Sequence, residues 1–324
     1  MIDPHVHCRD GEESYKETIK HVFEIAKKQG IEKIFDMPNT KPPLLGKKEL
    51  LNRLKLVPKE RRKDYFVYIA ATPNEKQLKE AIKCYKEFRN VVGLKLYATI
   101  DSSSSKKVEK NIYVPKERDQ EFIYKILSEN DYRGVLALHC EKAVFIKKDL
   151  WNPEKPISHG IARPKISEIE AIKDQIRFAK KYNFKGILHI CHISTKEGVE
   201  LVKKERKSIR ITCGVTPHHI LWSDRKLKEC NGLLYKTNPP LRGIKDVIAL
   251  RRYLKNGLID WIESDHAPHA LIEKLFYPHL SGYPSLILYS IIVNDLLPSI
   301  GMNEKMIRKV TFENIYKIFR DRLE

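Results

Sequence analysis

Short apolar runs alternate along the chain with longer stretches in which apolar residues recur at every third or fourth position. The short runs are typical of buried strands, and the longer stretches are typical of amphipathic helices. The pattern predicts eight strands, at Ile2–His7, Lys33–Met37, Phe66–Ala71, Val91–Tyr97, Val135–Cys140, Ile187–His192, Ile209–Gly214 and Leu258–Ser264. It predicts helices between most of these strands and two more at the end, at Ser14–Gln29, Lys47–Leu56, Asn74–Phe88, Lys116–Glu129, Ser167–Tyr182, Thr195–Lys204, Lys245–Asn256, Ser285–Leu297 and Asn303–Phe319.

A strand followed by a helix, repeated along the whole chain, predicts a closed parallel (β/α)8 barrel. Local signals agree with this order of elements. Asn74 precedes a predicted helix with Gln77 three residues on, which is the spacing of a capping box, and Ser167 stands in the same relation to Glu170. No internal repeat or linker divides the sequence, so we expect a single barrel domain across residues 1–324.

The composition is that of a chain that can bury a large core, since 42% of its 324 residues are apolar. No run of ~18 apolar residues is present, so we expect no membrane partner. The opening stretch MIDPHVHCRD carries charges where a signal peptide needs an apolar core. The six cysteines are scattered without a CxxC pair. We interpret them as reduced thiols, which favours a cytoplasmic protein.

The net charge of +19 is the most unusual total in the composition. The lysines are spread over the whole length, and no stretch interleaves basic with aromatic residues as a nucleic-acid groove would. We therefore expect no nucleic-acid partner. The alternative, a polyanion-binding surface, predicts binding that weakens steeply with salt. The positive charge favours capture of a small anionic substrate.

Polar residues gather where the predicted strands end. Asp3, His5 and His7 occupy every second position of the first strand, so they are expected to share one face. The alternative is a polar N-terminal strand without chemistry. In barrels of this class the chemistry lies at the C-terminal ends of the strands. The predicted ends bring together four histidines, a lysine and an aspartate: His5, His7, Lys95, His139, His192 and Asp265.

This set of side chains suits a pair of divalent metal ions. Imidazole and carboxylate both favour zinc and similar ions. Two cations close together need an anionic bridge, and Lys95 could supply it if CO2 carbamylates its amine. The alternative for Lys95 is that its amine extends to solvent. Asp265 could serve both as a ligand and as a proton carrier.

The alternation of side chains along a strand also assigns the neighbours of these residues. Cys8, Cys140 and Cys191 each adjoin a predicted ligand, so we expect them to face the surrounding helices as packing residues. His189 and His192 are three positions apart, so they point to opposite faces of a regular strand. We expect only His192 to face the barrel interior.

The motifs DPHVHCRD, MPNTKPP, GLKLYA, LHCE, ICHISTKEG, TPHH, TNPPLR and SDHAPH occur in this order. The ordered set resembles the dihydroorotases of the amidohydrolase superfamily, from residue 3 to about residue 320. Many relatives begin earlier, with strands of a small β-sandwich. This chain resembles a short form that is expected to lack that domain.

The resemblance implies a role for each matching position. His5 and His7 match the ligands of one metal ion, His139 and His192 those of the second, and Lys95 the carbamylated bridge. Asp265 matches the ligand that also acts as general base and acid. The residues that match the groups around the substrate are Arg9, Asn39 and His269 at its carboxylate and Asn238 near its ring. For Asn238, a turn residue before two prolines, a purely structural role is the alternative.

The implied reaction is the reversible cyclisation of N-carbamoyl-L-aspartate to L-dihydroorotate in pyrimidine synthesis, by a hydroxide that bridges two metal ions, with zinc expected. One alternative is another cyclic-amide hydrolase of the allantoinase or hydantoinase type. A second is a catalytically inactive scaffold. The sequence leaves open whether the chain forms a homo-oligomer or associates with aspartate transcarbamoylase. The Ser-rich segment within Thr99–Lys107 follows Lys95, and we hypothesise that it forms a lid.

Overall fold

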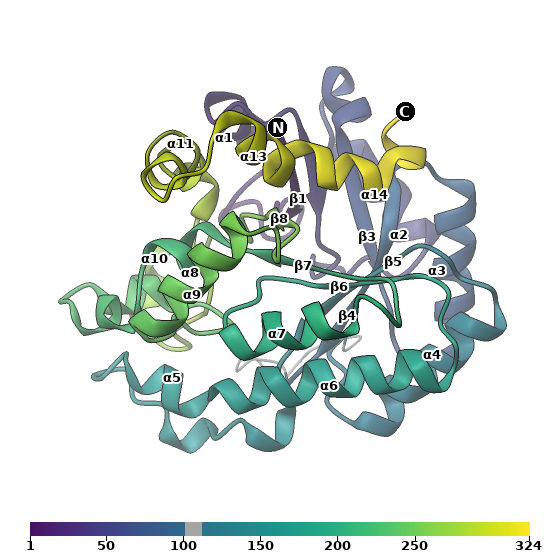
Figure 1. Cartoon of the computed structure of the whole chain (residues 1–324). Coiled ribbons are helices and arrows are strands. Elements are labelled where there is room, and N and C mark those ends of the chain that lie inside the picture. The colour runs from purple at the N-terminus through teal and green to yellow at the C-terminus, as the bar shows by residue number, and fades with distance from the viewer. Residues whose placement is uncertain (101–111) are drawn as a thin grey trace.

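The computed structural model describes residues 1–100 and 112–324, and it confirms the predicted barrel (Figure 1). In that part of the chain, parallel strands pair in sequence order in one eight-stranded sheet. The sheet closes on itself because β1 and the segment after β8 are joined by two backbone hydrogen bonds, from His7 to His266 (2.8 Å) and from Asp265 to His5 (3.0 Å). The strands are β1 (Ile2–Val6), β2 (Lys33–Asp36), β3 (Tyr65–Ala70), β4 (Val91–Ala98), β5 (Val135–Cys140), β6 (Ile187–Ile190), β7 (Ile211–Val215) and β8 (Trp261–Ile262).

Helices cover the outside of this barrel. Asn74 caps its helix as predicted, since its side chain accepts a hydrogen bond from the amide of Gln77. The prediction for Ser167 is wrong: the helix begins two residues earlier, after Pro164, and Ser167 lies buried inside its first turn. The helices are α1 (Ile19–Lys28), α2 (Lys47–Leu56), α3 (Glu75–Glu87), α4 (Glu117–Glu129), α5 (Ser158–Ala162), α6 (Lys165–Lys181), α7 (Lys196–Glu205), α8 (Pro217–Leu221), α9 (Ile244–Lys255), α10 (Leu271–Leu275), α11 (Tyr289–Ile291), α12 (Leu297–Ser299), α13 (Glu304–Arg308) and α14 (Asn314–Leu323).

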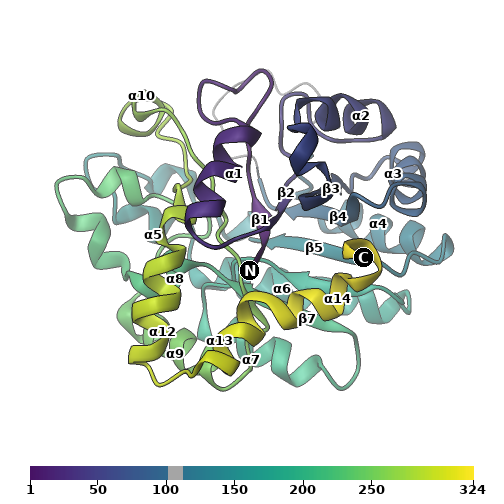
Figure 2. The ribbon, with the colours of Figure 1, turned by 90° about the horizontal axis from the view of Figure 1, so that it is seen from above.

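The core has two layers. The larger one lies between the strands and the surrounding helices, and it includes Cys8 and Cys140 as predicted. The smaller one fills the lower barrel with side chains such as Phe35 and Trp261. Helix α14 adds Phe319 to that inner layer. Figure 2 shows α13 and α14 lying across the end of the barrel at which the chain begins. The last helix therefore closes the N-terminal end of the barrel. The opposite end, where the strands end, is available for a functional site.

Irregularities in two strands decide which side chains point inward. The pairing of β3 with β4 shifts register near Gly93, where an added Cβ would lie 2.5 Å from the Val135 carbonyl oxygen. A bulge of this kind re-aims the residues that follow it, and Lys95 is fully buried. A second shift lies between Asp3 and Val6 in β1.

The prediction that Asp3 shares a face with His5 and His7 is wrong. Its carboxylate accepts hydrogen bonds from the backbone amides of His5 (3.3 Å) and Ser264 (3.0 Å), so it joins the strands and does not enter the histidine cluster. The irregular pairing of β1 removes the strict alternation on which the prediction rested.

No helix among residues 1–100 and 112–324 combines the length and the apolar character that crossing a membrane requires. The Ser-rich segment for which we hypothesise a lid lies outside the described residues from Asp101 onward.

Candidate metal centre and active site

A cavity of about 790 Å³ opens at the C-terminal end of the barrel strands. Five of the six predicted metal ligands line it, and each is less than a tenth exposed: His5, His7, His139, His192 and Asp265. The four residues predicted to surround the substrate line the same cavity: Arg9, Asn39, Asn238 and His269. The structure thus brings together side chains that lie far apart in the sequence.

The first group of potential ligands combines the end of β1 with the segment after β8. Asp265 Oδ1 lies 3.3 Å from His5 Nε2 and 2.9 Å from His7 Nε2. His7 Nδ1 lies 2.6 Å from Asn39 Oδ1, and because an amide oxygen can only accept, this contact places the proton on Nδ1. The Nε2 lone pair of His7 is then free for a cation, as second-sphere contacts usually arrange it.

Two members of this group, His7 and Asp265, carry the charges that suit a cation. Burial lowers the pKa of His7 to about 4, which keeps its imidazole neutral near pH 7. Burial alone would raise the pKa of Asp265, but the contacts with His7 and His5 outweigh it and hold the pKa below its usual range. A neutral imidazole beside an ionised carboxylate is the pairing that divalent metal ions bind.

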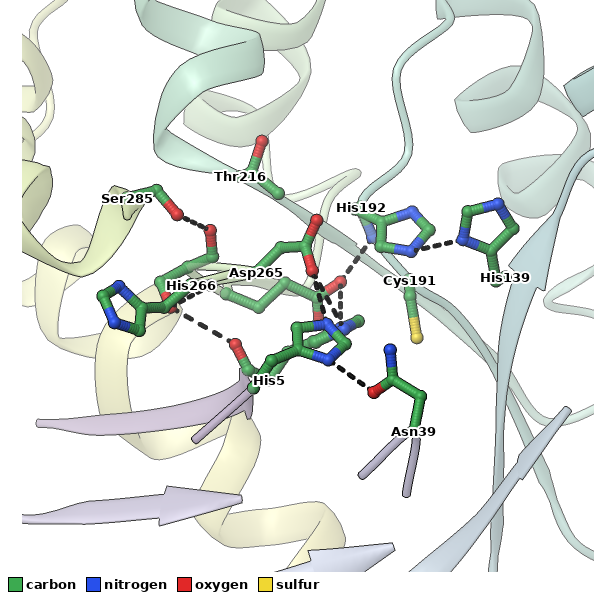
Figure 3. A network of polar contacts seen from close by, with 12 residues as sticks. His5, Asn39, His139, Cys191, His192, Thr216, Asp265, His266 and Ser285 are labelled. Carbon is green, nitrogen blue, oxygen red and sulfur yellow. Dashed lines mark hydrogen bonds and ion pairs between the residues drawn. The ribbon is translucent and has the colours of Figure 1, made fainter. Parts of the chain in front are cut away.

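The second group consists of His139 at the end of β5 and His192 after β6. His139 Nδ1 lies 3.2 Å from His192 Nε2, a contact marked by a dashed line in Figure 3. His139 Nε2 donates to the Glu141 carboxylate at 2.8 Å, so the lone pair of its other nitrogen faces His192. Two ring nitrogens in this relation can share a proton or bind one cation between them.

Glu141 is held in turn by Arg163, which precedes α6. Arg163 Nη2 donates to Glu141 Oε2 at 2.6 Å and Nε donates to Oε1 at 3.0 Å. Burial would raise the pKa of Glu141, but Arg163 and His139 outweigh it and lower the pKa far below its usual range. The sequence reasoning missed both residues. Glu141 lies two positions after His139, so the alternation of a strand predicts that both side chains point to the same face. This spacing could have identified Glu141. Arg163 lies between α5 and α6, in a stretch for which the sequence pattern predicts no element.

Replacing Arg163 by methionine tests this support. We expect the affinity for the ion at His139 and His192 to fall about 10- to 100-fold, because the freed Glu141 no longer fixes the imidazole. Competition with a fluorescent zinc chelator measures the loss. Arg133→Met, which removes an exposed guanidinium that pairs with Asp131, is the matched control. Equal affinities in the two variants would contradict a positioning role for Arg163.

Lys95 reaches the same region from β4 but does not line the cavity. Its Nζ lies 3.0 Å from Cys191 Sγ, and both side chains are buried. The prediction that Cys191 faces the helices is therefore wrong. In Figure 3 its sulfur lies below the His139–His192 pair. Burial would raise the pKa of this thiol, but the neighbouring Lys95 outweighs it and lowers the pKa to about 5.

The prediction that only one of His189 and His192 faces inward is also wrong. His189 Nε2 lies 2.9 Å from Glu263 Oε2, and its ring stacks on Trp261 in the barrel. His192 faces the cavity as well because its backbone adopts the left-handed conformation, with φ of 39°. This conformation interrupts the alternation of the strand. Arg9 (φ 56°) and Asp265 (φ 48°) are turned into the site in the same way.

Glu263 lies beneath the two groups and is a third residue that the sequence reasoning missed. Burial would raise its pKa, but His189 and His5 outweigh it and hold the pKa well below the usual range. Its carboxylate also accepts a hydrogen bond from the backbone amide of His192. Glu263 lies two positions before Asp265, so the alternation of a strand predicts that both point to the same face. This spacing could have identified Glu263.

The residues predicted to contact the substrate lie in the walls of the cavity. Arg9 Nη2 lies 3.3 Å from His269 Nε2, and Arg9 Nε donates to the Pro268 carbonyl at 3.3 Å. Burial lowers the pKa of His269 to about 3, so its imidazole is neutral. Asn238 accepts a hydrogen bond from His159 Nε2 at 2.9 Å, which fixes the amide in the cavity wall. A guanidinium and neutral donors thus face the space above the histidines.

The structure thus combines an eight-stranded barrel with histidines and a carboxylate that lie together at the C-terminal ends of its strands. No family model matches the sequence. Among solved structures, the barrel superposes on an L-hydantoinase from Arthrobacter aurescens with a TM-score of 0.83 at 23% identity, over 98% of this chain and 70% of that one. A dihydroorotase from Campylobacter jejuni gives 0.70 at 18% identity, over 98% and 82%.

By sequence, the chain is similar to curated dihydroorotases. It is 31% identical to that of Methanosphaera stadtmanae and 34% identical to that of Pyrococcus horikoshii, over 85% of this chain in both cases. It spans 59% and 55% of the length of these two relatives. With the dihydroorotase of Fusobacterium nucleatum it shares 29% identity over 98% of this chain and 72% of the relative. In sequence the chain is thus similar to dihydroorotases, and in fold it is similar to a hydantoinase and a dihydroorotase.

Proposed function

We propose that the chain is a dihydroorotase, an enzyme that interconverts N-carbamoyl-L-aspartate and L-dihydroorotate. The observation that carries the proposal is that one cavity holds both sets of residues: potential metal ligands on its floor, and Arg9, Asn39 and His269 in its walls. A ring amide held by its carboxylate at Arg9 would present its carbonyl to the floor. The net charge of +19 favours the approach of such an anion.

The donor set on the floor fits two divalent ions, with zinc the ion that imidazole and carboxylate favour. His5, His7 and Asp265 would hold one ion, and His139 and His192 the other. Lys95 lies below both groups, and its amine becomes an anionic carbamate on reaction with CO2, with release of a proton. Bound there, the ions would polarise the ring carbonyl and lower the pKa of water toward ~7.

The protein's own groups perform the proton transfers in this proposal. Asp265, ionised because His7 and His5 stabilise its charge, accepts the proton of the attacking water. It then delivers that proton to the ring nitrogen as the carbon–nitrogen bond breaks, and the second proton of the water is released when the new carboxyl group ionises to a carboxylate. Asn39 fixes the tautomer of His7 throughout. Ring closure is the reverse sequence and takes up one proton.

Substrate choice tests this proposal against the hydantoinase alternative. Dihydrouracil has the same ring as dihydroorotate without the carboxylate, so a dihydroorotase hydrolyses it far more slowly. Changing Arg9 to methionine is expected to lower kcat/KM for dihydroorotate about 10- to 100-fold, since a charged hydrogen bond is lost. The same change leaves kcat/KM for dihydrouracil within about threefold.

Lys41→Met is the matched control, because Lys41 lines the same cavity but is largely exposed and pairs with Glu13 at 3.2 Å. Its removal is expected to change kcat/KM for dihydroorotate by less than about threefold. An unmodified protein that hydrolyses dihydrouracil or hydantoin as fast as dihydroorotate would contradict the assignment.

A further inference from the structure

A buried ion pair lies outside the cavity, next to the loop that carries Arg9. Arg53 is a buried residue of α2, and its Nη2 donates to Asp36 Oδ2, at the end of β2, at 2.8 Å. Tyr65 at the start of β3 donates to the same oxygen at 2.5 Å. None of these three side chains lines the cavity. A buried ion pair adds little stability over apolar side chains of similar size, so its contacts indicate what it does.

The contacts of this pair lie on both sides of Arg9. Asp36 Oδ1 accepts a hydrogen bond from the backbone amide of Cys8 at 2.9 Å. Arg53 Nη1 donates to the backbone carbonyl of Asp10 at 2.7 Å. We propose that Arg53 and Asp36 are positioning residues that fix the direction of the Arg9 side chain. This inference rests on the carboxylate-binding role proposed above for Arg9.

The backbone of Arg9 has a conformation that needs support. Its φ of 56° lies in the left-handed region, which residues with a side chain rarely adopt. The amide of Asp10 donates to the carbonyl of Cys8 at 2.5 Å, which closes a three-residue turn with Arg9 at its centre. Turns of this kind with a positive φ are rare and strained, and they persist where the surrounding structure holds them. Without its support, the loop is expected to relax and to turn Arg9 out of the site.

The guanidinium of Arg9 has only weak contacts of its own. Its Nε donates to the Pro268 carbonyl at 3.3 Å, and its Nη2 lies 3.3 Å from His269 Nε2. Both distances are longer than the usual range for a hydrogen bond between nitrogen and oxygen or nitrogen. The backbone must therefore supply much of the orientation of this side chain. A displacement of about 1 Å at a group that holds the substrate can cost on the order of 100-fold in rate.

The forked shape of the Arg53 guanidinium lets one side chain hold two partners. Its Nε and Nη2 face Asp36 Oδ2, at 3.1 Å and 2.8 Å, while Nη1 faces the Asp10 carbonyl. A lysine has the same charge but a single ammonium nitrogen on a flexible chain. Arg53→Lys therefore keeps the charge balance with Asp36 and releases the carbonyl of Asp10.

Kinetics with two substrates test this role. Arg53→Lys is expected to lower kcat/KM for dihydroorotate about 10-fold, mainly through KM, because a displaced Arg9 holds the carboxylate less well in the ground state and the transition state alike. For dihydrouracil, which lacks the carboxylate, kcat/KM is expected to stay within about twofold. In an Arg9→Met background, Arg53→Lys is expected to cost less than about twofold with dihydroorotate, since the residue through which it acts is gone. Equal losses with both substrates, or in both backgrounds, would overturn the proposal.

Arg206→Lys is the matched control. Arg206 Nη2 donates to Asp260 Oδ2 at 2.6 Å and to the Leu258 carbonyl at 2.9 Å, and the same Asp260 oxygen accepts from the amide of Cys213 at 2.8 Å. The same kinds of contact thus occur before β8, away from the cavity. This variant is expected to change kcat/KM for either substrate by less than about twofold. Thermal unfolding of both variants shows whether they fold.

A crystal structure of Arg53→Lys tests the positioning role without relying on activity. We expect the φ of Arg9 to leave the left-handed region, or its guanidinium to move by about 1 Å or more from His269. If this variant does not fold, Asp36→Asn combined with Arg53→Met removes both charges together, which a core tolerates better than one unpaired charge. An Arg9 that keeps its φ and its place in the folded variant would overturn this inference alone. An Arg9 that moves, in a protein that does not hydrolyse dihydroorotate, would overturn only the proposed function.

Discussion

Replacing Lys95 by alanine is expected to lower kcat for dihydroorotate hydrolysis by at least ~1000-fold, because the two cations that we propose would lose the anion between them. The side chain is fully buried and its amine contacts Cys191 in place of a carboxylate. Without Lys95, which lowers the pKa of the buried Cys191 thiol, that thiol is expected to stay protonated, so no unpaired charge is left in the core and the barrel is expected to fold. Metal content measured with the rate should fall to about one ion or fewer.

A small carboxylic acid such as propionate is expected to restore part of the activity of Lys95→Ala, since it supplies an anion in the space left by the side chain. Lys33→Ala is the matched control: Lys33 lies at the start of β2 and pairs with Asp64. Its kcat is expected to stay within about twofold of the unmodified value. Near-native turnover by Lys95→Ala would show that Lys95 is a packing residue.

Replacing Asp265 by asparagine is expected to lower kcat about 1000-fold, within the range that general acid–base catalysis contributes. Asparagine preserves the size of the side chain and can still contact His7, but it cannot accept and deliver the proton. Steady-state rates and metal content are measured on the same samples, so that loss of the proton carrier is separated from loss of an ion.

Asp260→Asn is the control for this change. Asp260 precedes β8 and pairs with Arg206 at 2.6 Å, outside the cavity. We expect this variant to lose stability and to keep its kcat. If Asp265→Asn retained full turnover with both ions bound, another residue would have to move the proton.

The regular elements and most of the rim could be predicted from the sequence because they depend on local rules. Lys47–Leu56 and Val135–Cys140 coincide with the observed α2 and β5, because the apolar pattern alone delimits both elements. His139 was placed correctly because β5 alternates without interruption up to its last residue. In a regular strand, residues at odd and even positions point to opposite faces. The position of a residue in the strand is then enough to predict which side chains meet at the rim.

The remaining parts of the site depend on backbone features that carry no sequence period. Left-handed conformations at His192 and Asp265 and register shifts in β1 and β4 change the direction of the side chains. Cys191 was assigned to the wrong face for this reason. Arg163 reaches Glu141 only through the tertiary fold, and a single sequence holds no signal for that contact.

The most direct test is to strip the purified protein with a chelator, return Zn2+ stepwise in bicarbonate buffer, and follow dihydroorotate hydrolysis at each step. Activity is expected to be absent after chelation and to rise to a plateau only once the ligand groups at the rim are filled, with Lys95→Ala inactive at every step. Hydrolysis that persists in the stripped protein, or none at any amount of zinc, would contradict a metal-dependent dihydroorotase.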